Sequence, residues 1–547
     1  MARHRGNKAV PLDIGLRRQI ETALAANAIA RAAKLAETAL GRGADDPMIL
    51  NLVAWRREEA GDFAGAHGLL RRALALAPGD PLILAAIAAV LRKEGALDEA
   101  LVAVGRALAA APLHAPIWLE RGYVHDALRN WADARASYVR AIELDPMLAP
   151  AIAKLADAAA KDGDMATGTV LANRALALAS DEPTAVCALA AVDLEQRNGA
   201  AAEARLRGLL KGRVSGDDRT RALTLLGDAL DRQDRIAEAF ATYGEAQRNF
   251  RKLYAPDLAP QAGRPSHRDF VEAVARQMPA IAPERWQHPP AAAGDMAANH
   301  VFLLGYPRSG TTLVENVLAS GPGVVALEER ETLIDTDDVL IANDGAMPDL
   351  GALEPAVIER LRAAYWARVV GMAGEVAGKT FVDMNPFNGI KLPIIARLFP
   401  DAKILIMRRD PRDIVLSCYR INFTPSTAAW AFSDLAEIAR HYAALMTLIE
   451  RARERLPLAF HEVRYDALVA DFETTIRDLA RFVGLPWTDD FRRFDRTAQA
   501  RGVRTASATQ VRRGLFDGRG QWRRYADQLA PVLPILAPWV SRYGFDA

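Results

Sequence analysis

The 547-residue sequence predicts an α solenoid followed by an α/β domain with a mostly parallel sheet. In the first half, Arg72-Ala73-Leu74 and Arg106-Ala107-Leu108 stand 34 residues apart, and two equivalent triplets follow at the same spacing. In the second half, apolar runs such as Val301–Leu304 and Ile404–Met407 are each followed by a polar turn and a helical pattern. A fixed period of this length is typical of stacked helix pairs, and strands that alternate with helices are typical of a parallel sheet.

The repeats are expected to occupy residues 12–250, as about six or seven units. Prolines recur at the same period, at Pro78, Pro112 and Pro146, and turn signals such as Gly61-Asp62 and Gly163-Asp164 share it. The pattern resembles the tetratricopeptide repeat, a pair of helices with small residues at the tight crossings. An unrelated helical bundle is the alternative, and it would not produce so regular a register.

Stacked repeats form a concave face that commonly binds peptides, so we expect a peptide or protein partner there, or self-association. Four aromatic residues either line this groove or fill the core between helices: Trp55, Trp118, Trp131 and Tyr138. Residues 251–298 are rich in proline, alanine and glycine, and they read as a connector that contains one helix, Asp269–Met278. The second domain is expected at 299–547.

The most informative motif follows the apolar run Val301–Leu304 and reads Gly305-Tyr306-Pro307-Arg308-Ser309-Gly310-Thr311-Thr312. It has the frame of a phosphate-binding P-loop, but threonine replaces the usual lysine after the second glycine. The cation is instead Arg308. Backbone N–H groups and the positive end of the next helix can still hold an oxyanion. A turn that only packs helix against strand, and a variant nucleotide kinase or NTPase, are the alternatives.

A second motif begins where the run Ile404–Met407 ends, and it reads Arg408-Arg409-Asp410-Pro411-Arg412-Asp413 followed by a helix, Ile414–Tyr419, that contains Ser417. Arginines at the carboxyl end of a parallel strand suit a ligand phosphate. Together the two motifs resemble sulfotransferases that use 3′-phosphoadenosine 5′-phosphosulfate (PAPS) as co-substrate. The resemblance implies that Arg409 and Ser417 hold the 3′-phosphate. It also assigns the 5′-phosphosulfate to the loop residues Arg308, Ser309, Gly310, Thr311 and Thr312. A charged helix start capped by Asp413 is the alternative.

Two later segments extend this resemblance over about residues 300–545. Tyr465 ends the stretch Phe460–Tyr465, and in the family a tyrosine at this place contacts the adenine nucleotide. The segment Thr505–Arg513 resembles the loop that covers the cofactor, which implies phosphate contacts from Ser507 and Arg513. A core position is the alternative for Tyr465.

Sulfuryl transfer to a hydroxyl needs a proton acceptor and positive charge near the departing oxygen. No histidine lies between His300 and His441, so the small-molecule branch with a catalytic histidine fits poorly. Protein-tyrosine sulfotransferases use a glutamate about twenty residues after the loop, which implies Glu329 as base and Arg308 as the catalytic cation. Glu328 is the near alternative, and a solvated acidic helix start is another.

One departure from that family is Met384, which stands where the family has a lysine that stabilises the departing charge. Lys379 and Lys391 are candidate replacements, and Arg308 acting alone is the third possibility. The resemblance therefore leaves open a repeat scaffold with a vestigial nucleotide site. For an active enzyme, the acceptor could be a protein tyrosine recruited by the repeats, a glycan, a lipid or a small alcohol.

Composition sets broad limits. The chain is 51% apolar and 25% charged, and 69 basic residues against 68 acidic ones leave a net charge of +1, which gives no general attraction to nucleic acid. Cys187 and Cys418 form no disulfide framework and have no metal-ligand spacing, so no metal is expected. No apolar run approaches 18 residues, and no signal core follows the N-terminus. We therefore expect a cytoplasmic protein without a membrane span.

Overall fold

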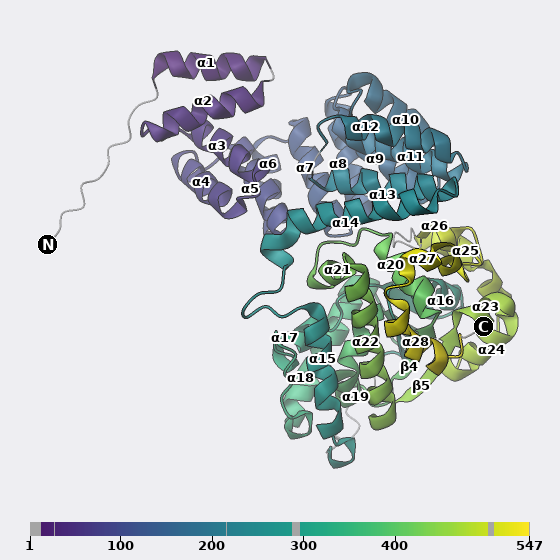
Figure 1. The fold of residues 1–547 in the computed structure, drawn as a ribbon. Coiled ribbons are helices and arrows are strands. Elements are labelled where there is room, and N and C mark those ends of the chain that lie inside the picture. Colours follow the sequence, from purple (N-terminus) through teal and green to yellow (C-terminus); the bar gives the residue numbers. More distant parts are fainter. Residues whose placement is uncertain (1–12, 27, 215, 287–295, 502–507, 546–547) are drawn as a thin grey trace. The chain divides into compact units, whose positions relative to one another are not determined.

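The computed structural model describes residues 13–26, 28–214, 216–286, 296–501 and 508–545 (Figure 1). The chain divides into two compact units. The first unit comprises residues 1–160 and 164–189, and the second comprises residues 161–163 and 190–547. The predicted boundaries at 250 and 298 remain predictions.

The first unit is a series of antiparallel helix pairs, as the repeat period predicted. The second helices of four consecutive pairs begin at Phe63, Leu97, Trp131 and Met165, which keeps the 34-residue spacing. The helices are α1 (Ile14–Ala25), α2 (Ile29–Gly41), α3 (Pro47–Glu59), α4 (Phe63–Leu76), α5 (Pro81–Glu94), α6 (Leu97–Ala110), α7 (Ala115–Ala127), α8 (Trp131–Leu144), α9 (Ala149–Asp162), α10 (Met165–Leu178) and α11 (Pro183–Glu195), which ends in the second unit. The predicted α solenoid is confirmed.

Local chemistry explains the repeat boundaries. Asp80 caps α5, where its carboxylate accepts hydrogen bonds from the N–H groups of Leu82 (2.8 Å) and Ile83 (3.2 Å). The turn inside each pair needs a left-handed residue, and Gly95 supplies it with φ 84°. Tyr138 is 2% exposed, so it belongs to the core, whereas Trp55, Trp118 and Trp131 are half-buried.

The second unit begins with three more helices of the repeat region, α12 (Gly199–Lys211), α13 (Gly216–Arg232) and α14 (Ile236–Leu258). The predicted connector helix is α15 (His267–Gln277), which starts two residues earlier than expected because Ser266 caps its N-terminus through the N–H of Asp269. The two short 3₁₀ turns Met278–Ala280 and Pro283–Arg285 follow it.

A five-stranded sheet forms the centre of the second unit, and all its neighbouring strands are parallel. The strands are β1 (Asn299–Leu304), β2 (Val324–Glu328), β3 (Thr380–Met384), β4 (Lys403–Arg408) and β5 (Ala459–Arg464), in the order β2-β3-β1-β4-β5. Along β1, Phe302 and Leu304 face one apolar cluster while Val301 and Leu303 face the other. Burial on both faces explains why this strand is an unbroken apolar run.

Helices cover both faces of the sheet (Figure 1). They are α16 (Thr311–Ala319), α17 (Ile334–Leu340), α18 (Pro355–Ala373), α19 (Leu392–Leu398), α20 (Pro411–Tyr419), α21 (Thr427–Phe432), α22 (Leu435–Arg455), α23 (Tyr465–Ala470), α24 (Phe472–Val483), α25 (Phe494–Arg501), α26 (Ala508–Arg512), α27 (Ala526–Leu529) and α28 (Leu533–Arg542). The 3₁₀ turns are Leu350–Ala352, Pro386–Lys391, Asp489–Arg493 and Gln521–Tyr525. Because β3, β1 and β4 are neighbours, the loops after Met384, Leu304 and Arg408 meet at one edge of the sheet.

Candidate active site

The loop between β1 and α16 turns tightly under close packing. The N–H of Ser309 donates to the carbonyl oxygen of Tyr306 at 3.0 Å, and Gly310 caps α16 with φ 112°. A Cβ at Gly305 would lie 2.7 Å from the Ser309 hydroxyl, and one at Gly310 would lie 3.1 Å from the ring of Tyr465. Glycine is therefore required at both positions, because the chain passes too close to its neighbours for a side chain.

Polar groups in the loop Gly305–Thr312, the anion loop, fit a bound anion. The Ser309 hydroxyl is fully buried, and it has no hydrogen-bond partner among the described residues. Thr311 and Thr312 are buried in the first turn of α16, the positive end of the helix. A buried polar atom without a partner is costly, so its presence here fits the phosphate or sulfate group that the sequence predicted.

Arg308 brings the two predicted nucleotide motifs together. Its Nε donates to the Ser417 hydroxyl on α20 at 3.0 Å, and its carbonyl oxygen accepts from Arg409 Nη1 at 3.0 Å. Burial and the charge of Arg409 lower the pKa of Arg308 to about 10. Two half-buried guanidinium groups whose charges act on each other favour an anion beside them, because its charge would offset their repulsion.

Arg409 also contacts the late part of the chain. Its Nη2 donates to the carbonyl oxygen of Gly518 at 2.6 Å, and its guanidinium carbon lies 4.8 Å from the ring centre of Tyr465. Its Nε is buried and has no partner among the described residues. The Tyr465 hydroxyl donates to the carbonyl oxygen of Phe516 and accepts from the N–H of Gly518 at 3.2 Å. Tyr465 thus lies beside Arg409 and the anion loop.

These residues enclose a cavity of only about 30 Å³. Its walls are Arg308, Gly310, Leu313, Arg409, Tyr465, Gln510, Val511, Gly514 and Phe516. Gln510 and Val511 belong to the segment Thr505–Arg513 that was predicted to cover the cofactor, and Gly514 directly follows it. Of the two phosphate contacts predicted in that segment, Ser507 lies outside the described residues. Arg513 forms an ion pair with Glu195 of α11, so its predicted role has no support from the described geometry.

The predicted base Glu329 directly follows β2. Its backbone N–H donates to the carbonyl oxygen of Met384 at 2.7 Å, and its φ of 47° is in the left-handed region. Its carboxylate is near enough to raise the pKa of Arg308, against the larger opposite effects of burial and Arg409. Glu328 is the last residue of β2 and pairs in register with Met384. Glu329 and Arg308, the two predicted catalytic residues, therefore lie near each other.

Met384 is completely buried, and its side chain belongs to the apolar cluster on the α16 side of the sheet. Lys379 directly precedes β3, at the end opposite Met384, and its Nζ donates to the carbonyl oxygen of Glu375. Lys391 lies on the loop side, where its Nζ contacts Asp337 at 2.6 Å and Glu331 at 3.5 Å. Of the two lysines that the sequence offered as replacements, only Lys391 is at the same edge of the sheet as the anion loop.

Sequence reasoning missed a buried polar network behind Glu329. The Asp383 carboxylate accepts from Thr332 Oγ1 at 2.6 Å and from the Tyr365 hydroxyl at 2.9 Å, and His300 Nε2 is 2.7 Å from that hydroxyl. Burial raises the pKa of Asp383 to about 6. Asp383 sits in the apolar strand Thr380–Met384, and a carboxylate there was the signal that could have revealed the network.

A second buried charge, Glu315, lies on α16 directly after the loop. Its Oε1 accepts from Arg501 Nη2 at 2.6 Å, and Arg501 also donates to Asn316 Oδ1 and to the carbonyl oxygen of Ala326. Burial raises the pKa of Glu315 although Arg501 opposes the rise. This pair ties α25 to α16 and β2, the elements that carry the loop and the predicted base.

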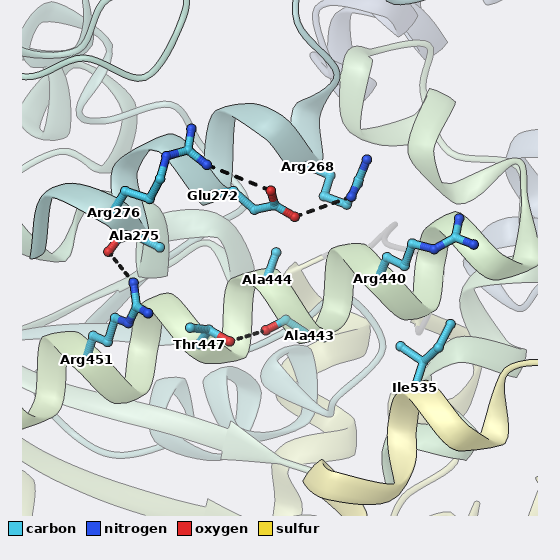
Figure 2. Close-up of a pocket in the computed structure, with 10 residues that line it drawn as sticks. All are labelled: Arg268, Glu272, Ala275, Arg276, Arg440, Ala443, Ala444, Thr447, Arg451 and Ile535. Carbon is cyan, nitrogen blue, oxygen red and sulfur yellow. Dashed lines mark hydrogen bonds and ion pairs between the residues drawn. The ribbon is translucent and has the colours of Figure 1, made fainter.

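A larger pocket, of about 420 Å³, lies between α15 and α22 (Figure 2). Glu272 lies between Arg268 and Arg276, with ion pairs of 3.3 Å and 3.9 Å. Arg440 and Arg451 line the α22 side. No predicted site residue lines this pocket, so we place the candidate active site at the sheet edge, where those residues converge.

No group of three or more His, Cys, Asp or Glu side chains in the described ranges is arranged to hold a metal ion. Among the helices described, none combines the length and apolar character needed to cross a membrane.

Comparison with known proteins agrees with both halves of this architecture. Residues 300–489 match the model of a sulfotransferase family, and residues 58–121 match a tetratricopeptide-repeat model. The sulfotransferase match covers β1 to β5 and therefore includes the anion loop, Glu329, Arg409, Ser417 and Tyr465.

Several curated proteins are similar to the same region. An uncharacterized protein of Aquifex aeolicus is 29% identical over 253 residues, which are 44% of this chain and 33% of that protein. Protein-tyrosine sulfotransferase 1 of Danio rerio is 26% identical over 263 residues, 45% of this chain and 72% of the fish protein. Protein-tyrosine sulfotransferase A of Caenorhabditis elegans is 23% identical over 257 residues, with 45% and 67% covered. The match thus spans only a third of the Aquifex relative.

The site geometry and these matches converge on the same part of the chain. Residues 300–489 carry the sulfotransferase family pattern on a parallel sheet, and they follow a region of tetratricopeptide repeats.

Proposed function

We propose that this protein is a PAPS-dependent sulfotransferase that transfers a sulfuryl group to an acceptor hydroxyl. The observation that carries this proposal is the convergence of Arg308, Ser417 and Arg409 beside the unpartnered Ser309 hydroxyl. These groups come from two motifs about a hundred residues apart, and together they offer donors for two separate phosphate groups.

In this proposal the loop holds the 5′-phosphosulfate. Ser309, Thr311, Thr312 and the backbone N–H groups at Gly310 would donate to its oxygens, and Arg308 would balance its charge. Arg409 and Ser417 would hold the 3′-phosphate, and Tyr465 would contact the adenine nucleotide. A cavity of about 30 Å³ is far smaller than the roughly 300 Å³ of an ordinary ligand pocket. Nucleotide binding therefore requires the segment Val511–Gly518 to move away from Tyr465.

PAPS supplies the sulfuryl group and leaves as 3′-phosphoadenosine 5′-phosphate (PAP). The bond from sulfur to the acceptor oxygen forms as the bond from sulfur to the 5′-phosphate oxygen breaks. Glu329 would take the proton of the acceptor hydroxyl, and Arg308 would stabilise the charge that develops on the departing phosphate oxygen. Their proximity supports this division of roles.

The proposed acceptor class is drawn from the repeats and the named relatives. We propose a protein tyrosine recruited by the tetratricopeptide repeats, because such repeats commonly bind peptides and several similar proteins are named protein-tyrosine sulfotransferases. A glycan, a lipid or a small alcohol is the alternative acceptor. We propose a cytoplasmic enzyme that needs no metal.

A transfer assay tests the proposal. The full-length protein and its Glu329→Gln variant would each be incubated with sulfur-labelled PAPS and cell extract, and the labelled species would be identified. Label on a protein, released as tyrosine sulfate on hydrolysis, supports the full proposal. Label on a glycan, lipid or small alcohol supports transfer but overturns the tyrosine acceptor. No label above the variant, together with no PAP binding, overturns the proposed function.

One observation favours a second function, a repeat scaffold with a vestigial nucleotide site. Met384 is buried where the related family has a lysine, so one expected cation is missing from the site. The two functions differ in one outcome: a scaffold of this kind would bind neither PAPS nor PAP and would transfer no label.

A further inference from the structure

The helices α13 and α14 come from the repeat region but contact the end of the helix that carries Ser417. On α14, Gln247 Nε2 donates to the carbonyl oxygen of Tyr419 at 2.8 Å. On α13, the Thr224 hydroxyl accepts from Asn422 Nδ2 at 2.7 Å. The carboxyl end of α20 and the residues after it are thus held by side chains of two repeat-region helices.

The strongest of these contacts is made by Arg420, the residue directly after α20. Its guanidinium lies 3.0 Å from Asp231 Oδ2 and 3.4 Å from Asp228 Oδ1, both on α13. The ring centre of Tyr243 on α14 is 5.1 Å away, close enough for a cation–π contact. Arg420 is therefore a largely buried cation whose two carboxylate partners are both on α13, and its guanidinium carbon also lies 5.7 Å from the ring centre of Tyr525.

Asp231 holds a second segment as well. Its Oδ1 accepts from the Tyr525 hydroxyl at 2.7 Å and from Arg524 Nη1 at 2.9 Å. Both belong to the chain that follows Gly518, whose carbonyl oxygen accepts from Arg409. One carboxylate on α13 therefore contacts both chain segments that flank the predicted 3′-phosphate site.

The same two segments are joined to each other through α20. The carboxylate of Asp413 on α20 accepts from the N–H groups of Gly520 and Trp522, each at 2.8 Å. Asp413 and Asp231 thus hold α20 and the late segment at two points. Because the carboxylates accept several hydrogen bonds each, small displacements of α13 would be transmitted to both segments.

We infer that Asp231 is a positioning residue for the nucleotide site. Through Arg420 and Tyr525 it fixes α20 and the late segment, and so sets the geometry of Arg409 and Ser417. The property it controls is discrimination in favour of nucleotides with a 3′-phosphate. The inference rests on the proposed function, and it makes the last helix pair of the repeat region a part of the nucleotide site.

The test measures selectivity rather than overall affinity, because a merely structural role would weaken all nucleotides alike. Calorimetry on the full-length protein would give dissociation constants for PAP and for adenosine 5′-phosphate (AMP), which lacks the 3′-phosphate. In Asp231→Asn, which keeps the shape but removes the charge, we expect PAP affinity to fall about tenfold, the equivalent of one misplaced contact. AMP affinity should change by less than about twofold.

Asp231→Asn leaves Arg420 with one carboxylate fewer, and an uncompensated buried charge can prevent folding. The double variant Asp231→Asn/Arg420→Gln removes both charges and tests the same linkage if the single variant does not fold. The matched control is Arg251→Gln, because the hydrogen bond and the ring contact of Arg251 on α14 go to Ser433 and to Trp430 of α21, and not to Arg420 or Tyr525. We expect the control to keep the wild-type ratio of PAP to AMP affinity.

An unchanged ratio in a folded Asp231 variant would overturn the inference, and so would an equal loss of PAP and AMP affinity. These results differ from failure of the proposed function. A wild-type protein that binds neither PAPS nor PAP would overturn the function itself. A wild-type protein that selects PAP, beside an Asp231 variant that selects it equally well, would overturn only the role of Asp231.

Discussion

The repeat turns and the candidate active site both use left-handed backbone, but they fill it with different residues. In the repeats, the turn positions Gly61, Gly95 and Gly163 have φ between 79° and 88°. At the site, the left-handed positions outside glycine are Arg308, with φ 71°, and Glu329, with φ 47°. Glycine adopts this conformation at no steric cost, whereas other residues do so at about 1–2 kcal/mol each.

The difference indicates what each region requires of its backbone. A repeat turn needs only a change of direction, so glycine is the least costly residue. Arg129, Arg197 and Asp234 stand at three equivalent turns with φ 59° to 60°, so the repeats can also carry the strain of a side chain without an evident chemical use. At the site, both strained residues are the predicted catalytic ones, and strain of this kind commonly accompanies function. The predictions below challenge this comparison.

The largest effect is expected from Glu329→Gln. If this carboxylate takes the acceptor proton, turnover should fall by about 10²–10⁴-fold while PAP affinity stays near wild type. Steady-state transfer from labelled PAPS and calorimetry with PAP measure the two quantities. Glu328→Gln is the matched control and should retain most activity. A larger loss in the control would transfer the role to Glu328.

The variant Arg308→Gly separates the effect of backbone strain from the effect of the side-chain charge. Glycine adopts a φ of 71° without strain, and the substitution removes the guanidinium group. Turnover should fall by about 10²–10³-fold, the usual cost of losing one donor to a developing anion. Thermal unfolding should be unaffected or shifted upward, because the strain is relieved. Arg129→Gly in the repeats should relieve similar strain without changing turnover. Equal turnover of Arg308→Gly and wild type would contradict the claim that the strained residue Arg308 is catalytic.

A smaller effect is expected from Arg409→Ala, which acts on binding. Losing charge-assisted contacts worth about 1.5–3 kcal/mol should weaken PAP by roughly 10–150-fold. AMP, without the 3′-phosphate, should lose much less. Arg412→Ala is the control, because Arg412 pairs with Asp410 and donates to the carbonyl oxygen of Phe545. Similar losses for both nucleotides would move the 3′-phosphate site elsewhere.

The smallest effect is expected on the free energy of unfolding, from Asp383, which holds the segment that follows the strained residue Glu329. Thr332, three residues later, donates to the buried Asp383, whose pKa burial raises to about 6. The folded state therefore binds the proton of the Asp383 carboxyl group more tightly than the unfolded chain does. This binding stabilises the fold at low pH, and the stabilisation is lost as the pH rises from about 4 to 6.

Asp383→Asn should not show this loss. Between pH 4.5 and pH 8, ionisation of Asp383 should lower the free energy of unfolding of the wild type by about 2 kcal/mol. The free energy of unfolding of the variant should lack this contribution. Thermal or denaturant unfolding of both proteins across this range measures the difference. A constant difference across the range would mean that Asp383 does not titrate near pH 6.

Sequence reasoning succeeded where signals are local. The helix starts at Phe63, Leu97 and Trp131 follow from the 34-residue spacing, which recurs in each repeat. The loop from Gly305 to Thr312 is recognisable because its functional residues are adjacent in the sequence. The anion loop and the Arg409 motif were both predicted, because each is a continuous strand, turn and helix start.

What the sequence could not supply are contacts between distant residues. The Arg308–Ser417 hydrogen bond joins positions 109 apart, and the Arg420–Asp231 pair joins positions 189 apart. No local pattern marks Asp231 as different from the other acidic residues of the repeats. The role of Arg513 could not be derived either, because a surface arginine can pair with any nearby carboxylate, here Glu195.

The central claim is that the sheet edge around Arg308 and Arg409 binds a nucleotide with both a 5′- and a 3′-phosphate. Calorimetric titration of the full-length protein with PAP, AMP and Mg²⁺-ATP tests it most directly. The account predicts one PAP per chain, bound at least about tenfold more tightly than AMP or Mg²⁺-ATP. Absence of PAP binding, or a preference for Mg²⁺-ATP, would contradict it.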